Sequence, residues 1–176
     1  MSASVRKALS LGMSGFSCCN IDVPTCDVAT DDAMFARWFS YAMLSTHFRL
    51  HMNIDSNRPV DFKPETFELF KNLYALRQSL APYLFSCAAD ATSLGYPVMR
   101  PLSLEFQNDP AVYSIDRQYM LGSSIMVVPV LSETGSLVYY MPAGKWTNLL
   151  TGEVVTGPCF KDVSVESTQI PVFVRP

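Results

Sequence analysis

The stretch Gly95-Tyr-Pro-Val-Met-Arg-Pro-Leu-Ser-Leu-Glu-Phe106 marks a change in the hydrophobic pattern of this sequence. Before it, from Pro64 to Leu94, apolar side chains recur with a period near 3.6 residues, which predicts helix, and Gly95 is a typical helix terminator. Within the stretch, apolar residues from Leu102 to Phe106 alternate with polar ones, which predicts a half-buried strand. The helical part of the chain therefore ends here.

Upstream of this point the pattern is that of helices and one strand. A short helix is predicted from Ala3 to Leu11, and the small and apolar residues from Phe16 to Ile21 predict a buried strand. Thr30 is a suitable N-cap for a second helix that runs to about Leu44. Proline lacks the N–H that a helix interior needs, so Pro82 predicts a kink or two abutting helices within the long helical stretch.

Downstream, nearly all signals are those of strands and turns. Turn-forming residues separate the apolar runs, as in a small antiparallel β domain. We therefore divide the chain into an α/β part, residues 1–121, and an all-β part, residues 122–176. The predicted strands of the second part are 125–131, 137–141, 146–150, 154–155, 163–165 and 170–174.

The first part is short for the fold that its strand and helix order suggests. Its strands and helices amount to roughly two units of an eightfold (β/α)8 barrel, which usually needs ~250 residues. Two units cannot close a barrel. The segment is therefore either a small α+β domain or the tail of a barrel whose other strands lie elsewhere.

The charge balance excludes two classes of partner. The chain has 13 Lys and Arg against 16 Asp and Glu, a formal net charge of -3. Binding to phosphate backbones or anionic membranes depends on clustered cations, so we expect neither nucleic acid nor membrane as a partner. No secretory signal or membrane-length apolar run is present, and any signal peptide of a longer parent would be missing here. The sequence specifies neither a compartment nor an oligomeric state.

The five cysteines give no disulfide framework and no zinc site. Their number is odd and no C-x-x-C pair occurs, so reduced thiols are expected. His47 and His51 are four residues apart, as in a helical zinc motif, but position 48 is Phe and no third ligand is evident. We predict no metal and no cofactor.

Six motifs, in order and over nearly the whole chain, resemble the C-terminal motifs of glycoside hydrolase family 31. Together they are far more specific than any one of them. They are Leu44-Ser-Thr-His-Phe-Arg-Leu-His51, Leu80-Ala-Pro-Tyr-Leu-Phe85, Gly95-Tyr-Pro-Val-Met-Arg-Pro-Leu102 with Glu105-Phe106 and Asp109, Asp116-Arg-Gln-Tyr-Met-Leu-Gly122, Met126-Val-Val-Pro-Val130 and Ile170-Pro-Val-Phe-Val-Arg175.

The resemblance implies an α/β fold: the C-terminal portion of a (β/α)8 TIM barrel, residues 1–121, followed by part of a β-sandwich domain, residues 122–176. It also implies a retaining α-glycosidase that hydrolyses terminal α-linked glucose or xylose, with an α-linked oligosaccharide or glycoside as its partner. In this family the nucleophile and the general acid/base are two aspartates upstream of the matched segment. We therefore predict no catalytic residue in this chain, and no activity for the chain alone.

The resemblance places two substrate-binding residues here. His51 matches a histidine that binds sugar hydroxyls where cleavage occurs, and Asp22 matches an aspartate near the same subsite. A carboxylate and an imidazole together can satisfy a hydroxyl, which both donates and accepts hydrogen bonds. Asp22 could instead cap a helix or pair with an arginine. Arg49 could pair with an acidic side chain behind the pocket and hold the segment that carries His51, but an ordinary structural ion pair is the favoured interpretation.

The sequence departs from the family pattern around these residues. Cys18-Cys19-Asn20-Ile21 and Val23-Pro24-Thr25 flank Asp22, where the family has an aromatic residue, a histidine and two glycines. Pro59-Val60-Asp61-Phe62 replaces a Pro-Trp pair. A second hypothesis is therefore a non-catalytic, sugar-binding or structural remnant of the family.

Overall fold

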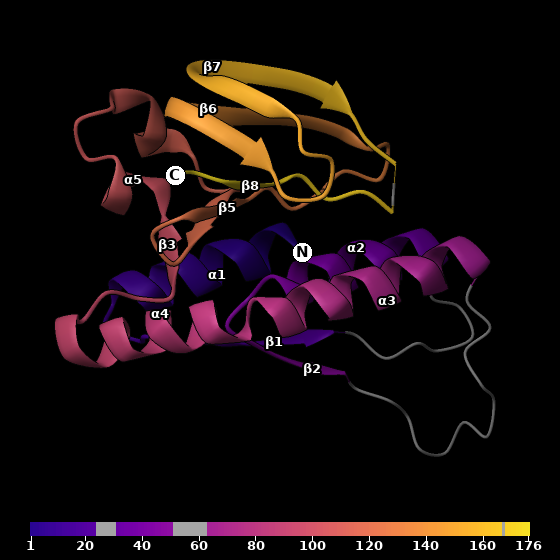
Figure 1. The fold of residues 1–176 in the computed structure, drawn as a ribbon, viewed down its shortest axis with the longest axis horizontal. Coiled ribbons are helices and arrows are strands. Elements are labelled where there is room, and N and C mark those ends of the chain that lie inside the picture. The colour runs from indigo at the N-terminus through magenta and orange to yellow at the C-terminus, as the bar shows by residue number, and fades with distance from the viewer. Residues whose placement is uncertain (24–30, 51–62, 167) are drawn as a thin grey trace.

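Four helices separate a small sheet from a larger one in the computed structural model (Figure 1), which describes residues 1–23, 31–50, 63–166 and 168–176. The helices that form this middle layer are α1 (Ser2–Met13), α2 (Asp32–Met43), α3 (Pro64–Ser79) and α4 (Ala81–Leu94). A short helix and a 3-10 turn follow them, α5 (Leu102–Glu105) and η1 (Pro110–Ser114). No helix in these ranges is both long and apolar enough to cross a lipid bilayer.

The small sheet is a parallel pair, β1 (Asn20–Val23) and β2 (His47–Leu50). Helix α2 makes the crossover between the two strands, and it contacts both of them. Parallel strands need such a crossover, since a tight turn would reverse the chain direction. The order strand, helix, strand, helix is that of two successive units of an α/β barrel.

The large sheet is antiparallel and six-stranded, with the order β3-β4-β5-β8-β6-β7. Its strands are β3 (Met99–Pro101), β4 (Tyr119–Leu121), β5 (Ile125–Val127), β6 (Ser136–Asn148), β7 (Val154–Ser164) and β8 (Val172–Val174). This sheet agrees with the predicted all-β part. It takes strands from both sides of residue 122, and the division of the chain at that residue stays a prediction.

Strands β4, β5 and β8 are buried on both faces. One set of side chains joins the core cluster that the helices share: Tyr119, Leu121, Ile125, Val127 and Val172. The alternate side chains join a second cluster inside the β part: Met120, Met126 and Phe173. Two-sided burial explains why these strands are continuously apolar rather than alternating.

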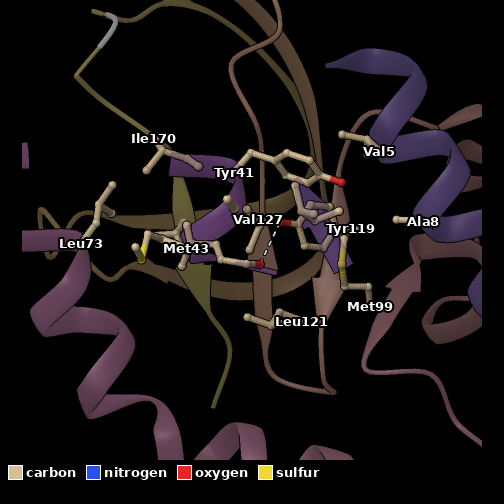
Figure 2. Packing of buried hydrophobic residues seen from close by; sticks show 14 of the residues in the cluster. Val5, Ala8, Tyr41, Met43, Leu73, Met99, Tyr119, Leu121, Val127 and Ile170 are labelled. Atoms are coloured by element: carbon tan, nitrogen blue, oxygen red, sulfur yellow. Dashed lines mark hydrogen bonds between the residues drawn. The ribbon is translucent and has the colours of Figure 1, made fainter. Parts of the chain in front are cut away.

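A buried hydrogen bond ties this sheet to the barrel-like part. The hydroxyl of Tyr119 donates to the carbonyl of Leu44 at 2.8 Å, within the packed cluster of Figure 2. Tyr119 is fully buried, and its burial raises the pKa of the phenol well above its usual value. The phenol therefore stays neutral and serves as a donor at the end of α2.

Helix ends follow the predicted signals closely, with one correction. The long helical stretch is indeed two abutting helices, α3 and α4, on either side of Leu80, and Gly95 ends α4 with φ 78°. The N-cap of α2 is Asp31, whose side chain accepts from the N–H of Ala33, rather than Thr30. Thr30 lies outside the described residues.

One predicted strand was misplaced and another was wrong. The buried strand expected from Phe16 to Ile21 begins only at Asn20, and Phe16 is 59% exposed. The alternation from Leu102 to Phe106 belongs to helix α5 and its end, because Phe106 donates its N–H back to the carbonyl of Leu102 at 2.8 Å. This turn brings the carboxylate of Glu105 to two arginines, Arg100 and Arg175.

The predicted strands 137–141 and 146–150 form one long strand, β6, instead of two. A bulge between Met141 and Gly144 absorbs the residues that were expected to form a turn. Gly144 has φ 121°, a conformation that glycine adopts without steric cost. The strand continues through the bulge and pairs with both β7 and β8.

Gly122 provides a test of the packing between α4 and the large sheet. Its φ is 64°, and an added Cβ would collide with the thiol of Cys87 and the hydroxyl of Tyr83. Gly152 has a similar φ of 76° with nothing within 4 Å of such a Cβ, so it is the matched control. We expect Gly122→Ala to lower the free energy of unfolding by about 1–3 kcal/mol more than Gly152→Ala, measured by urea titration. Equal losses would contradict the packing described.

Candidate functional site

The face of the β1–β2 sheet that points away from the helices is polar. Ile21 and Val23 are buried toward the helices, and Phe48 packs against the same core. Because side chains alternate along a strand, the neighbouring positions point to the other face. We call these four residues the open strand face: Asn20, Asp22, His47 and Arg49.

A hydrogen-bonded carboxylate lies at the centre of the open strand face. Asp22 and Arg49 are register partners on the two strands, and the Nε of Arg49 donates to Oδ1 of Asp22 at 3.1 Å. The side-chain amide of Asn20 donates to the same oxygen at 2.5 Å. The side chains of Asp22 and Arg49 are 49% and 62% exposed, so this carboxylate is held in place while remaining accessible.

Arg49 is thus paired with Asp22 itself and not with an acidic side chain behind the pocket, and pairing with an arginine is the alternative role considered for Asp22. Asp22 and Arg49 both lie one residue before the last residue of their strands. In α/β barrels the functional groups gather at the carboxyl ends of the strands. His51 follows β2 directly and lies outside the described residues. Its predicted role as a sugar ligand stays a prediction.

Hydrogen bonds at the other end of the strands fix the position of β2. The hydroxyl of Thr46 accepts from the N–H of Cys19 at 3.2 Å and donates to the carbonyl of the same residue. Arg77 of α3 donates to the carbonyls of Met43 at 3.0 Å, Ser45, and Thr46 at 2.6 Å. Burial lowers the pKa of the Arg77 guanidinium, and Tyr119 partly offsets this effect. These contacts satisfy the carbonyls between α2 and β2.

The two cysteines before β1 have thiol pKa values above the usual value. Burial raises the pKa of the Cys18 thiol, and burial also raises that of Cys19 despite a hydrogen bond with Thr46. Thiolate, not thiol, is the reactive and metal-binding form. No group of three or more His, Cys, Asp or Glu side chains within the described ranges is arranged to hold a metal ion.

Asn20 and His47, two members of the open strand face, were not singled out from the sequence as site residues. Asn20 and Asp22 alternate with buried aliphatic residues, which is the pattern of a strand with one polar face. His47 was considered only together with His51 at helical spacing, although it belongs to a strand. The alternation was short, four residues in each strand, and the misplaced strand at Phe16 obscured it.

Fold and site together define a class: an α/β barrel segment with polar strand ends, joined to an antiparallel β domain. Residues 1–87 match the profile of the glycosyl hydrolases family 31 TIM-barrel domain, and residues 95–176 match that of the family's C-terminal domain. The chain belongs to glycoside hydrolase family 31. The predicted family and fold class are confirmed.

Curated relatives are longer enzymes. The chain is 35% identical to alpha-xylosidase XylQ of Lactiplantibacillus pentosus over 97% of its own length, and this match spans 23% of that relative. It is 29% identical to alpha-glucosidase 2 of Bacillus thermoamyloliquefaciens over 98% of its length, spanning 22% of the relative. The chain thus spans less than a quarter of the length of these relatives.

Solved structures of the family share the arrangement of this chain. A GH31 alpha-xylosidase from a soil metagenome, complexed with xylose, superposes with a TM-score of 0.83 at 26% identity, over 97% of this chain and 29% of that one. A GH31 sulfoquinovosidase from E. rectale, in complex with an aza-sugar inhibitor, gives 0.80 at 30% identity, over 99% and 27%. The first of these complexes contains a sugar and the second a sugar mimic.

Proposed function

We propose that the protein containing this chain is a retaining α-glycosidase that hydrolyses terminal α-linked glucose or xylose. The observation that carries the proposal is the Asp22–Arg49 pair at the carboxyl ends of two parallel strands. The matched barrel profile and the α-xylosidase and α-glucosidase relatives support it. The α-linked glycoside is the proposed substrate.

Asp22 and His51 bind sugar hydroxyls in this proposal, and Arg49 positions Asp22. A carboxylate can accept several hydrogen bonds, and in this proposal a sugar hydroxyl is one of the donors to Asp22. The nucleophile and the general acid/base come from other strands of the barrel. In a retaining mechanism they flank the scissile bond at about 5–5.5 Å from each other.

One substitution tests the role of Asp22. In the protein that contains this chain, we expect Asp22→Asn to lower kcat/KM for p-nitrophenyl α-xyloside or α-glucoside about 10- to 100-fold, since hydrogen bonds to a charged group contribute about 1.5–3 kcal/mol. The exposed ion pair with Arg49 contributes little to stability, so the fold should be retained.

Asp116→Asn is the matched control, because Asp116 also pairs with an exposed arginine, Arg6, at 3.3 Å but lies outside the open strand face. It should leave kcat/KM within about twofold of the unmodified protein. If Asp22→Asn is as active as this control, Asp22 does not bind the substrate.

A non-catalytic sugar-binding remnant is the second candidate. One observation favours it: Oδ1 of Asp22 already accepts from two protein donors, Asn20 and Arg49. The two candidates give different results in one experiment. A remnant would bind xylose or glucose in calorimetry, with weaker binding after Asp22→Asn, yet would release no p-nitrophenol.

A further inference from the structure

Asn20 is a residue of the open strand face to which the proposed function gives no role. It is the exposed first residue of β1, and its register partner on β2 is His47. Its side-chain amide lies 2.5 Å from Oδ1 of Asp22, two residues further along the same strand. The inference that follows rests on the proposed function, in which Asp22 binds the substrate.

The hydrogen bond between Asn20 and Asp22 has one possible donor. An ionised carboxylate only accepts hydrogen bonds, so the NH2 group of the Asn20 amide faces Asp22 and the amide carbonyl faces away from it. The guanidinium of Arg49, 3.1 Å from the same oxygen, favours the ionised form of the carboxylate. Asn20 therefore supplies an uncharged donor to a carboxylate that already has a cationic partner.

The two donors reach Asp22 from different directions. Asn20 donates along β1, whereas Arg49 donates across the sheet from β2. An exposed ion pair holds its partners only weakly, and the long side chain of Arg49 is 62% exposed. A second, shorter donor on the strand of Asp22 itself restricts the rotation of the carboxylate. Orientation matters in such a site because a small misplacement of a substrate-binding group lowers the rate.

We propose that Asn20 is a positioning residue for Asp22. Its amide holds the Asp22 carboxylate in the orientation in which a sugar hydroxyl donates to it. Asn20 begins β1 and Asp22 lies two residues closer to the carboxyl end of the strand, so Asn20 acts through Asp22 and not on the sugar itself. A side chain at position 20 serves this purpose only if it donates a hydrogen bond toward Asp22.

Two substitutions in the protein that contains this chain separate donation from shape. Asn20→Leu keeps a similar shape without a donor, and it should lower kcat/KM for p-nitrophenyl α-xyloside or α-glucoside about 3- to 30-fold by a similar factor from pH 5 to pH 8. Asn20→Asp donates only while protonated. Two carboxyl groups this close do not both ionise readily, so the pair shares a proton over a range of pH. That proton takes the place of the amide N–H, and its loss leaves two charges that repel each other.

The expected result is a pH-dependent rescue. Relative to the unmodified protein at the same pH, kcat/KM of Asn20→Asp should be within about threefold near pH 5 and at least about tenfold lower near pH 8. Arg49 and His47 are the charged or titratable side chains of the open strand face beside the pair, and α2 packs on the opposite face of β1. The same pH dependence should therefore appear in a His47→Gln background, and its disappearance there would overturn the proposal.

Asn148→Asp is the matched control for the added charge. The side chain of Asn148 accepts from the N–H groups of Leu150 and Thr151, bonds that a carboxylate keeps, and it lies outside the open strand face. This variant should stay within about twofold of the unmodified protein at both pH values. A loss at pH 8 as large as that of Asn20→Asp would assign the effect to overall charge and overturn the proposal.

Asn20→Asp preserves the size of the side chain, so the test does not depend on the folding of Asn20→Leu. A loss in Asn20→Asp that is the same at pH 5 and pH 8 would make Asn20 merely structural. If Asp22→Asn lowers kcat/KM while both Asn20 variants match the unmodified protein, the positioning role fails and the proposed function stands. For a protein without hydrolytic activity, the same comparison uses its calorimetric affinity for xylose and glucose. Absence of both hydrolysis and sugar binding would overturn the proposed function and this inference together.

Discussion

Replacing Glu105 with leucine is expected to lower the free energy of unfolding by about 3–5 kcal/mol. The carboxylate of Glu105 accepts from Arg100 at 2.5 Å and from Arg175 at 2.8 Å, and only 12% of the Glu105 side chain is exposed. The Arg100 side chain is 6% exposed, so the substitution leaves a buried guanidinium without its counter-charge. Removal of one partner of a buried pair costs far more than the pair itself contributes.

Urea titration of Glu105→Leu beside Asp116→Ala measures this difference. Asp116 pairs with Arg6 at 3.3 Å, but both side chains are 49% exposed, so Asp116→Ala should cost less than about 1 kcal/mol. The double variant Arg100→Met and Glu105→Leu should recover part of the loss, because it removes the stranded charge as well. A loss for Glu105→Leu as small as that of the exposed control would mean that the pair is not buried in solution.

The helices could be predicted because their signals are local. Gly95, Pro82 and the apolar period of α3 and α4 act within a few residues of where they stand, and the structure places the helix ends accordingly. The strand predicted from the alternation between Leu102 and Phe106 was wrong for the opposite reason. The residues form a helical turn closed by the N–H of Phe106 and the carbonyl of Leu102, and the carboxylate of Glu105 then reaches Arg175, 70 residues away, a contact that no local pattern contains.

The large sheet could likewise be predicted only in part from local sequence signals. The apolar runs predicted the approximate positions of the strands after residue 122, but the six predicted strands correspond to four, β5 to β8, because β6 and β7 each combine two of them. The pairing of β5 with β8 and of β6 with both neighbours depends on distant segments. Burial on both faces removed the alternation that would otherwise have shown which side chains face the helices. Hydrophobic periodicity alone could therefore not predict the order of the strands in the sheet.

At the candidate site, the resemblance singled out Asp22, and Arg49 was considered only as an ion-pair partner, so the two were not related to each other. Their pairing follows from the parallel register, in which Asp22 lies opposite Arg49 across a crossover through α2. The two residues are 27 positions apart, and no local sequence pattern predicts that they pair. Asn20 completes the arrangement through a hydrogen bond two residues along its own strand, which the alternation could have suggested.

The largest effect expected of any experiment here is complete loss: the 176-residue chain alone should hydrolyse no α-glycoside. Retaining hydrolysis needs two carboxylates on either side of the scissile bond, about 5–5.5 Å apart, and the described part of the chain has two barrel strands where a closed barrel has eight. Asp22, the carboxylate on these strands, is held by Asn20 and Arg49.

The same geometry predicts that this chain by itself is only marginally stable and prone to aggregate. Phe85 on α4 and Phe16 beside β1 are 78% and 59% exposed, and the β1–β2 pair has no neighbouring strand among the described residues. Purified chain should be assayed with p-nitrophenyl α-glucoside and α-xyloside while its thermal unfolding is followed. Turnover that copurifies with the chain and disappears in Asp22→Ala would refute the loss of activity. A sharp cooperative transition in a monomer would refute the marginal stability, because it would show that two barrel units and the β part suffice for a closed core.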